Sequence, residues 1–198
     1  MKVTVFDYGA GNLHSLLKAL EGDGRRVETE RDPLRALRTD VLVLPGVGAF
    51  GPAAERLAPA AVEMRAALTD GLPCLGICLG MQLLFDGSDE GPGCGLALIH
   101  GRVQELEGGR VPQIGWNTIE RDGEPLLERS PLPIAYYANS YVCRPDSASC
   151  VTAWSKHAGA RFPAIVRAGR TVGVQFHPEK SSAAGVAFMR TFLRETSA

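Results

Sequence analysis

A cysteine between two glycines is the arrangement in this sequence best suited to nucleophilic chemistry. The motif Gly76-Ile77-Cys78-Leu79-Gly80 follows an apolar run at 72–75 and precedes an amphipathic run at 81–85. This pattern predicts a buried strand that turns sharply into a helix, as in a nucleophile elbow. We expect the glycines to permit a positive φ and leave room beside the sulfur, and the helix start to favour thiolate over thiol. Cys78 is therefore a candidate nucleophile.

A second motif, far along the chain, contains the partners that such a thiol needs. In Gln175-Phe176-His177-Pro178-Glu179, the proline holds His177 extended, so that His177 and Glu179 can project to one side. A cysteine nucleophile needs a base, and the base needs a carboxylate that orients it. Alone, the Cys78 motif is equally consistent with a cysteine packed in an ordinary strand–helix turn. With His177 and Glu179 it predicts a catalytic triad.

Composition bounds the remaining possibilities. The chain has 198 residues, of which 45% are hydrophobic and 22% charged, which predicts one domain over residues 1–198. The net charge of −1 provides no basic field for nucleic acid or an anionic membrane. No apolar run is long enough for a membrane span, and the N-terminal run becomes charged too early for a signal peptide. These features predict a cytoplasmic protein that binds neither nucleic acid nor membrane.

The other cysteines and histidines do not form a metal or disulfide pattern. The five cysteines show no paired spacing, which indicates reduced thiols in a cytosolic protein. The histidines outside the second motif are scattered, so we expect no metal and no cofactor. We expect four cysteines to be packing residues: Cys74, Cys94, Cys143 and Cys150.

Apolar runs that alternate with helical patterns predict an α/β fold. Strands are expected at 2–7, 40–44 and 72–77, each followed by a helix, at 13–20, at 53–68 and from 79 onward. This alternation is typical of a mostly parallel central sheet flanked by helices. Shorter strand-like runs at 96–99, 135–138 and 164–167 indicate an added antiparallel or mixed portion, and a helix at 183–195 closes the chain.

Two glycine-rich turns follow predicted strands. Pro45-Gly46-Val47-Gly48 ends a parallel strand, so it should lie at the same sheet edge as Cys78. Its N–H groups, with that of Leu79, could hold the oxyanion formed when a thiolate attacks a carbonyl; an ordinary tight turn is the alternative. Gly9-Ala10-Gly11 resembles half of a dinucleotide-binding fingerprint but lacks the third glycine, so we expect no nucleotide there.

The motifs together resemble a known family. Pro45-Gly46-Val47-Gly48, the stretch from Gly76 to Gln82 and Phe176-His177-Pro178-Glu179 resemble the class I, triad-type glutamine amidotransferases, in the same order and over nearly the whole chain. Within that class, three stretches resemble the glutaminase subunits of imidazole glycerol phosphate synthase, which act in histidine biosynthesis: Asp7-Tyr8-Gly9-Ala10-Gly11-Asn12-Leu13, Pro112-Gln113-Ile114-Gly115-Trp116-Asn117 and His177-Pro178-Glu179-Lys180-Ser181.

The resemblance implies roles for particular residues. Cys78 would attack the side-chain amide of glutamine, His177 would carry the proton to the departing ammonia, and Glu179 would orient His177. The oxyanion would lie at Val47, Gly48 and Leu79. The substrate would be held by Gly46, Gln82, Glu90, Ser140 and Tyr141, with Glu90 at its α-amino group. Without the resemblance, Gln82 reads as part of a solvated helix face and Glu90 as a loop charge.

The resemblance also implies a partner. In the family, ammonia passes to a (β/α)₈-barrel cyclase subunit, and this chain has no room for such a barrel of about 250 residues. A heterodimer is therefore expected, with a contact surface at Trp116, Asn117, Tyr137 and Lys180, although core packing is an equal alternative for Tyr137. Asn139 stands where the family usually has His, so a titrating role there is in doubt.

Two other functions remain open on sequence grounds. The chain could be a glutaminase serving a different acceptor, in pyridoxal phosphate or purine synthesis. It could also be a non-catalytic binding or regulatory module that retained the fold, although the presence of Cys78, His177 and Glu179 argues against this.

Overall fold

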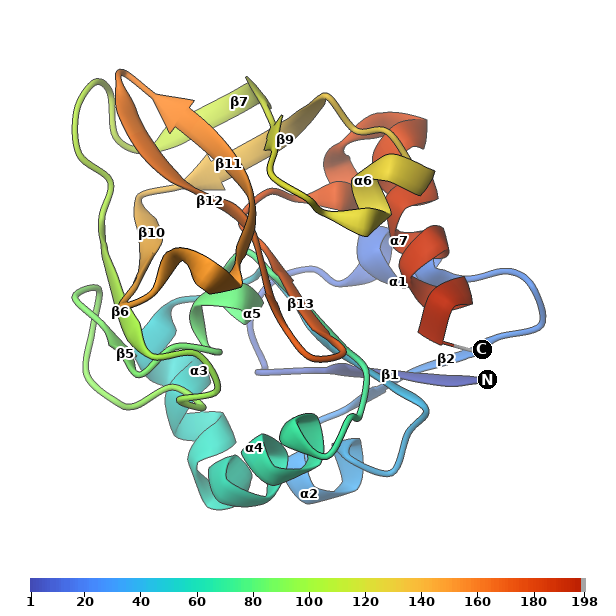
Figure 1. Cartoon of the computed structure of the whole chain (residues 1–198). Helices are drawn as coiled ribbons and strands as arrows, with labels where there is room; N and C mark the ends of the chain where they lie inside the picture. The colour runs from blue at the N-terminus through green and yellow to red at the C-terminus, as the bar shows by residue number, and fades with distance from the viewer. Residues whose placement is uncertain (197–198) are drawn as a thin grey trace.

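An eight-stranded sheet forms the centre of the computed structural model, which describes residues 1–196 (Figure 1). Its strand order is β2-β1-β3-β4-β13-β12-β11-β8. The parallel strands are β1 (Lys2–Phe6), β2 (Arg26–Glu30), β3 (Val41–Leu44), β4 (Cys74–Ile77) and β13 (Thr171–Val174). Three antiparallel strands extend the sheet: β12 (Ala160–Ala168), β11 (Val151–His157) and β8 (Glu120–Arg121).

Helices cover both faces of this sheet. Successive side chains of each buried strand point to opposite faces, so both faces are apolar and need cover. In β3, Val41 and Val43 belong to one hydrophobic cluster, and Leu42 and Leu44 belong to the other. The first cluster includes residues of α1 (His14–Leu20), α6 (Pro125–Arg129) and α7 (Ser182–Thr196). The second includes residues of α2 (Pro33–Ala36), α3 (Phe50–Leu57), α4 (Ala61–Thr69) and α5 (Leu79–Gln82).

Two smaller sheets make up the added portion. One has the order β10-β6-β5, with β5 at Gly87–Ser88, β6 at Gly101–Glu105 and β10 at Tyr141–Pro145. The other is a two-stranded antiparallel ribbon of β7 (Gln113–Thr118) and β9 (Ile134–Asn139), which lies at the top of Figure 1. None of the helices within residues 1–196 is long and apolar enough to cross a membrane.

The register of two parallel strands sets the position of the site. Gly173 pairs with Gly76 and Val174 with Ile77, so β13 and β4 end level with each other. The N–H of Cys78 then donates to the carbonyl of Val174 at 2.7 Å. The two chemical motifs found in the sequence therefore leave the sheet side by side, at the carboxyl ends of neighbouring strands.

The predicted α/β fold with a mixed portion is confirmed, but three element predictions need correction. The predicted helix at 53–68 is broken into α3, a 3₁₀ turn at Ala58–Ala60 and α4, because Pro59 has no N–H for a helical bond. The helix after Leu79 lasts only one turn. Residues 96–99 form no strand: the N–H groups of Leu96 and Leu98 donate instead to the carbonyls of Leu83 and Leu84.

The prediction that four cysteines are packing residues holds for Cys74 and Cys143, which are fully buried. It is wrong for Cys94, which is exposed in the loop after Pro92, and Cys150 is only half-buried. Cys94 stands between Gly93 and Gly95, which have no side chains to cover it.

Candidate active site

Cys78 occupies a strained turn between β4 and α5. Its φ of 47° and ψ of −102° are values that a residue with a side chain rarely adopts. The backbone is held on both sides of the turn, because its N–H bonds to Val174 and its carbonyl accepts from the N–H of Gln82 at 3.1 Å. The predicted strand–turn–helix elbow is present.

The two glycines of the motif act differently from the prediction. Neither Gly76 nor Gly80 has a positive φ; Cys78 itself carries that conformation. A Cβ on Gly76 would lie 2.7 Å from the Gly80 carbonyl oxygen, and one on Gly80 would lie 2.0 Å from that of Leu44. The glycines are needed because α5 packs directly on the backbones of β3 and β4.

His177 and Glu179 form the second half of the site. His177 precedes a 3₁₀ turn at Pro178–Lys180, and its Nδ1 lies 2.8 Å from the Glu179 Oε1, with both side chains nearly buried. Burial alone would lower the pKa of His177, but the hydrogen bonds and negative charges of Cys78 and Glu179 raise that pKa to about 9. Near neutral pH, a protonated imidazole therefore connects the sulfur to the carboxylate.

A cavity of about 200 Å³ opens beside the sulfur. This is the share of roughly seven waters in the liquid, at about 30 Å³ each, so it admits a small molecule. Its lining consists of Gly46, Gly48, Cys78, Leu79, Gln82, Glu90, Ala138, Asn139, Ser140 and Tyr141. All five residues predicted to hold the substrate lie in this lining, together with two of the three predicted oxyanion residues. Val47 instead lines a neighbouring cavity of about 290 Å³, beside Glu179.

Three polar side chains in the cavity wall are held by hydrogen bonds, two of them to the same carbonyl. The Gln82 Nε2 donates to the Tyr141 carbonyl at 3.2 Å, and the Asn139 Nδ2 donates to the same oxygen at 3.1 Å. The Glu90 Oε2 accepts from the N–H of Phe50, the first residue of α3, at 2.9 Å. The loop that carries Glu90 is therefore tied to the helix that follows the glycine turn.

The glycine loop after β1 packs against the turn after β3. A Cβ on Gly11 would lie 2.5 Å from the Val47 Cβ, and one on Gly48 would lie 3.3 Å from the Ala10 Cβ. A Cβ on Gly46 would meet the His177 Cε1 at 2.9 Å. The loop at Gly9–Gly11 therefore supports the predicted oxyanion turn, and the oxyanion turn touches the triad.

The predicted contact surface is only partly at the surface. Trp116 is 54% exposed, Asn117 is half-buried and Lys180 is exposed. Tyr137 is fully buried, with its hydroxyl 2.6 Å from the Ser155 Oγ, so its assignment to an interface is wrong. Alternation along β9 turns Tyr137 inward and its neighbour Tyr136 outward, and Tyr136 makes an edge-on contact with Trp116.

One buried residue next to the sulfur was not predicted. The Gln175 Nε2 donates to the Cys78 Sγ at 3.4 Å, and Gln175 is fully buried. A signal was present in the sequence, because Gln175 stands two residues before His177 and alternate residues of an extended segment share a side.

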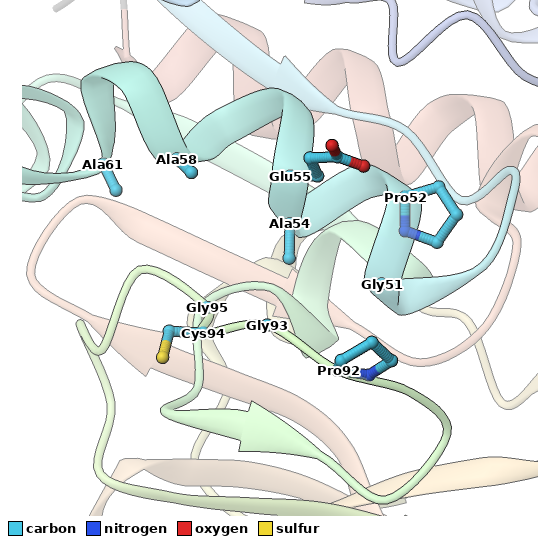
Figure 2. A pocket seen from close by; sticks show the side chains of 10 residues that line it. All are labelled: Gly51, Pro52, Ala54, Glu55, Ala58, Ala61, Pro92, Gly93, Cys94 and Gly95. Atoms are coloured by element: carbon cyan, nitrogen blue, oxygen red, sulfur yellow. The ribbon is translucent and has the colours of Figure 1, made fainter.

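A larger groove lies apart from these residues. It holds about 710 Å³ between α3, α4 and the loop at 92–95, and small side chains such as Ala54, Ala58 and Pro92 line it. Figure 2 shows Glu55 and Cys94 on its opposite walls. No triad residue reaches this groove, and within residues 1–196 no cluster of three or more His, Cys, Asp or Glu is placed to hold a metal ion.

Comparison with known proteins identifies the family. A family model described as glutamine amidotransferase class-I matches residues 4–196. The chain belongs to this family. It is accordingly a glutamine amidotransferase, and the elbow cysteine and the His177–Glu179 pair lie within the matched region.

Individual relatives agree over nearly the full length. The imidazole glycerol phosphate synthase subunit HisH of Synechococcus sp. (strain CC9902) is 41% identical over 200 residues, covering 98% of this chain and 94% of the relative. A HisH subunit of Thermus thermophilus is 42% identical over 198 residues, covering 96% of this chain and 95% of the relative. A crystal structure described as a glutamine amidotransferase shares the fold, with a TM-score of 0.75 at 19% identity and 99% of both chains covered.

Gly11→Ala should impair the glutaminase reaction more than it impairs folding. Both Gly9 and Gly11 have positive φ, so alanine at either position should cost about 1–2 kcal/mol of stability. Only at Gly11 does the new Cβ meet Val47; at Gly9 nothing lies within 4 Å. We expect kcat to fall about 10²-fold for Gly11→Ala, the scale of a lost oxyanion donor, and to be kept in Gly9→Ala. Equal kcat losses in the two variants would contradict the supporting role of Gly11.

Glu179→Gln should move the alkaline limb of the pH profile. We expect kcat/KM for glutamine hydrolysis to fall as pH rises through about 9, because the predicted role of His177 is to donate a proton to the departing ammonia. Without the carboxylate charge, the pKa of His177 drops, and the limb should shift down by about one pH unit or more. Glu63→Gln, an exposed carboxylate on α4, serves as the control. An unshifted limb in Glu179→Gln would show that this carboxylate does not set the protonation of His177.

Proposed function

We propose that this chain is the glutaminase subunit of an imidazole glycerol phosphate synthase, working in the cytoplasm without a cofactor. It would hydrolyse glutamine and pass the ammonia to a separate (β/α)₈-barrel cyclase subunit in histidine biosynthesis. The observation that carries the proposal is the cavity at Cys78: all the predicted substrate residues line it, and the Cys78 sulfur interacts with His177 of the His177–Glu179 pair. The relatives named as HisH subunits match over nearly their full length, which supports this choice of acceptor pathway.

The chemistry starts with the Cys78 thiolate, which attacks the side-chain carbonyl carbon of glutamine. The oxygen becomes negative and is held by the N–H groups of Gly48 and Leu79, which line the cavity. Val47, the third predicted donor, lines the neighbouring cavity, so its N–H would have to turn toward the substrate to take part. The His177 imidazolium gives its proton to the departing nitrogen, so ammonia leaves and a glutamyl thioester remains. Water then attacks the thioester while His177 takes a proton from it, and glutamate leaves as the thiolate is restored. Glu179 keeps Nδ1 protonated and the ring oriented throughout.

The cavity wall matches the other end of glutamine. One oxygen of Glu90 is bonded to the Phe50 N–H, and the other is left for the substrate α-ammonium. The backbone of Ser140 and Tyr141 contacts the substrate, and Gln82 in α5 donates a hydrogen bond to the Tyr141 carbonyl. Asn139 replaces the His usual in the family, and its buried Oδ1 has no hydrogen-bond partner among the described residues, so it is an acceptor without a charge.

A partner fits the exposed face of the β7–β9 ribbon. This face carries three exposed apolar side chains, Ile114, Trp116 and Ile134, together with Tyr136. The Tyr136 carbonyl accepts the N–H of His177 at 2.8 Å, so the ribbon is bonded directly to the active site. A subunit docked there would bury a Trp–Tyr pair of the kind that anchors interfaces, on a ribbon bonded to the segment that carries His177.

Cys78→Ala should abolish glutamine-dependent synthesis while leaving synthesis from added ammonia intact. The reason is that only the first reaction needs the sulfur, and the acceptor site lies on the partner. The measurement is imidazole glycerol phosphate formation by the reconstituted complex with either nitrogen source. Loss of both activities would mean that Cys78 serves folding or docking, and the proposed function would fail.

Trp116→Ala should weaken binding of the cyclase subunit by at least about tenfold, the effect of removing an aromatic anchor worth more than about 1.4 kcal/mol. Val62→Ala is the matched control, because Val62 is 67% exposed on α4, which packs in the other hydrophobic cluster. Titration calorimetry of each variant with the cyclase subunit gives the two affinities. Unchanged binding by Trp116→Ala would remove the ribbon from the interface.

A further inference from the structure

A buried amide touches the sulfur of the proposed nucleophile. The Gln175 Nε2 donates to the Cys78 Sγ at 3.4 Å, and no part of Gln175 reaches solvent. Gln175 does not line the cavity beside Cys78, so it does not face the substrate. Its contact with the site is through the sulfur alone.

The backbone holds this contact rigidly. Gln175 is the first residue after β13 and Cys78 the first after β4, and the register pairs the residues before them, Val174 and Ile77. The Gln175 N–H donates to the Ala164 carbonyl at 2.9 Å, and the Cys78 N–H donates to the Val174 carbonyl at 2.7 Å. Both residues are therefore fixed by the sheet.

The amide has a cost that packing does not explain. The Gln175 Oε1 is buried and has no hydrogen-bond partner within the described part of the chain. An unpaired buried carbonyl is unfavourable, and an apolar side chain of similar length would avoid it. An amide at this position therefore calls for a role of its Nε2.

We propose that Gln175 is a positioning residue for the glutaminase reaction, which holds the Cys78 sulfur as a thiolate aimed at the substrate. A thiolate has no proton and can only accept hydrogen bonds, so Nε2 and the His177 imidazolium together supply its two donors. Donors to the charged form favour that form. The inference rests on the proposed function, because it takes Cys78 as the nucleophile.

The other buried cysteines show what happens without such donors. Cys74 and Cys143 are fully buried, and within residues 1–196 no hydrogen bond reaches either sulfur. Burial raises the pKa of both thiols, so they stay protonated. Because α5 is a single turn, its dipole is short, and the side-chain donors at Cys78 carry more of this effect.

The test is the pH dependence of alkylation of Cys78 by iodoacetamide in the full chain, with each cysteine peptide quantified by mass spectrometry. The variants are Gln175→Met, which keeps the length and removes the donor, and Gln175→Glu, which places a negative charge at the sulfur. Gln113→Met is the matched control: Gln113 is also a buried amide with an unpartnered Oε1, and it has no contact with Cys78. Gln175→Leu replaces the methionine variant should that variant not fold.

We expect the alkylation midpoint of Cys78 to rise by about one pH unit in Gln175→Met, the effect of a lost hydrogen bond to a charged group, and further in Gln175→Glu. Gln113→Met should keep the midpoint of the parent chain. Glutaminase kcat of Gln175→Met should fall about tenfold with KM for glutamine unchanged, because Gln175 does not line the cavity. Its unfolding temperature should equal or exceed that of the parent.

An unchanged midpoint in Gln175→Met, or equal shifts in Gln175→Met and Gln113→Met, would overturn the positioning role. The proposed function itself would be overturned if Cys78 of the parent chain reacted no faster than the exposed Cys94 at neutral pH. The inference about Gln175 would then fall with it.

Discussion

The parallel pairing of β4 with β13 is the constraint on which the rest of the site depends. It brings the segment of Cys78 and the segment of His177 to one sheet edge, although they are far apart in the sequence. Glycines face each other across this pair: a Cβ on Gly173 would lie 2.8 Å from the Met81 Cγ, and one on Gly76 would lie 2.7 Å from the Gly80 oxygen. The close approach of α5 is possible because both positions lack side chains.

Burial then determines the electrostatics. His177 is nearly buried, which alone would favour its neutral form, yet the interactions of its ring with Cys78 and Glu179 raise its pKa to about 9. The same low-polarity surroundings strengthen every hydrogen bond to the sulfur. A strained Cys78 backbone is tolerated here because strand and helix bonds hold it on both sides. Burial of this turn in the fold therefore accounts both for the electrostatics of the site and for its rigidity.

The site is also connected to the surface of the molecule. The glycine turn at Gly46–Gly48 touches His177 and is supported by the loop at Gly9–Gly11, and the exposed β7–β9 ribbon is bonded to His177 through Tyr136. A change in conformation at either surface is therefore only one or two contacts away from His177. This arrangement suits the proposed transfer of ammonia to a partner subunit.

Local patterns in the sequence determined the elements and most of the chemistry. The alternation of apolar strands with helices predicted the sheet, and the motifs around Cys78 and His177 predicted an elbow and a His–Glu pair, because turn and pairing geometry at short range depends on neighbouring residues. Only the tertiary structure decided which side chains face inward. Tyr137 is in the core and Tyr136 is at the surface, and residues 96–99 donate to carbonyls near α5 instead of forming a strand. The spacing of Gln175 and His177 could indicate a shared side, but only the pairing of β13 with β4 brings Gln175 to the sulfur. Burial and long-range register arise from the whole fold, and a linear pattern does not specify them.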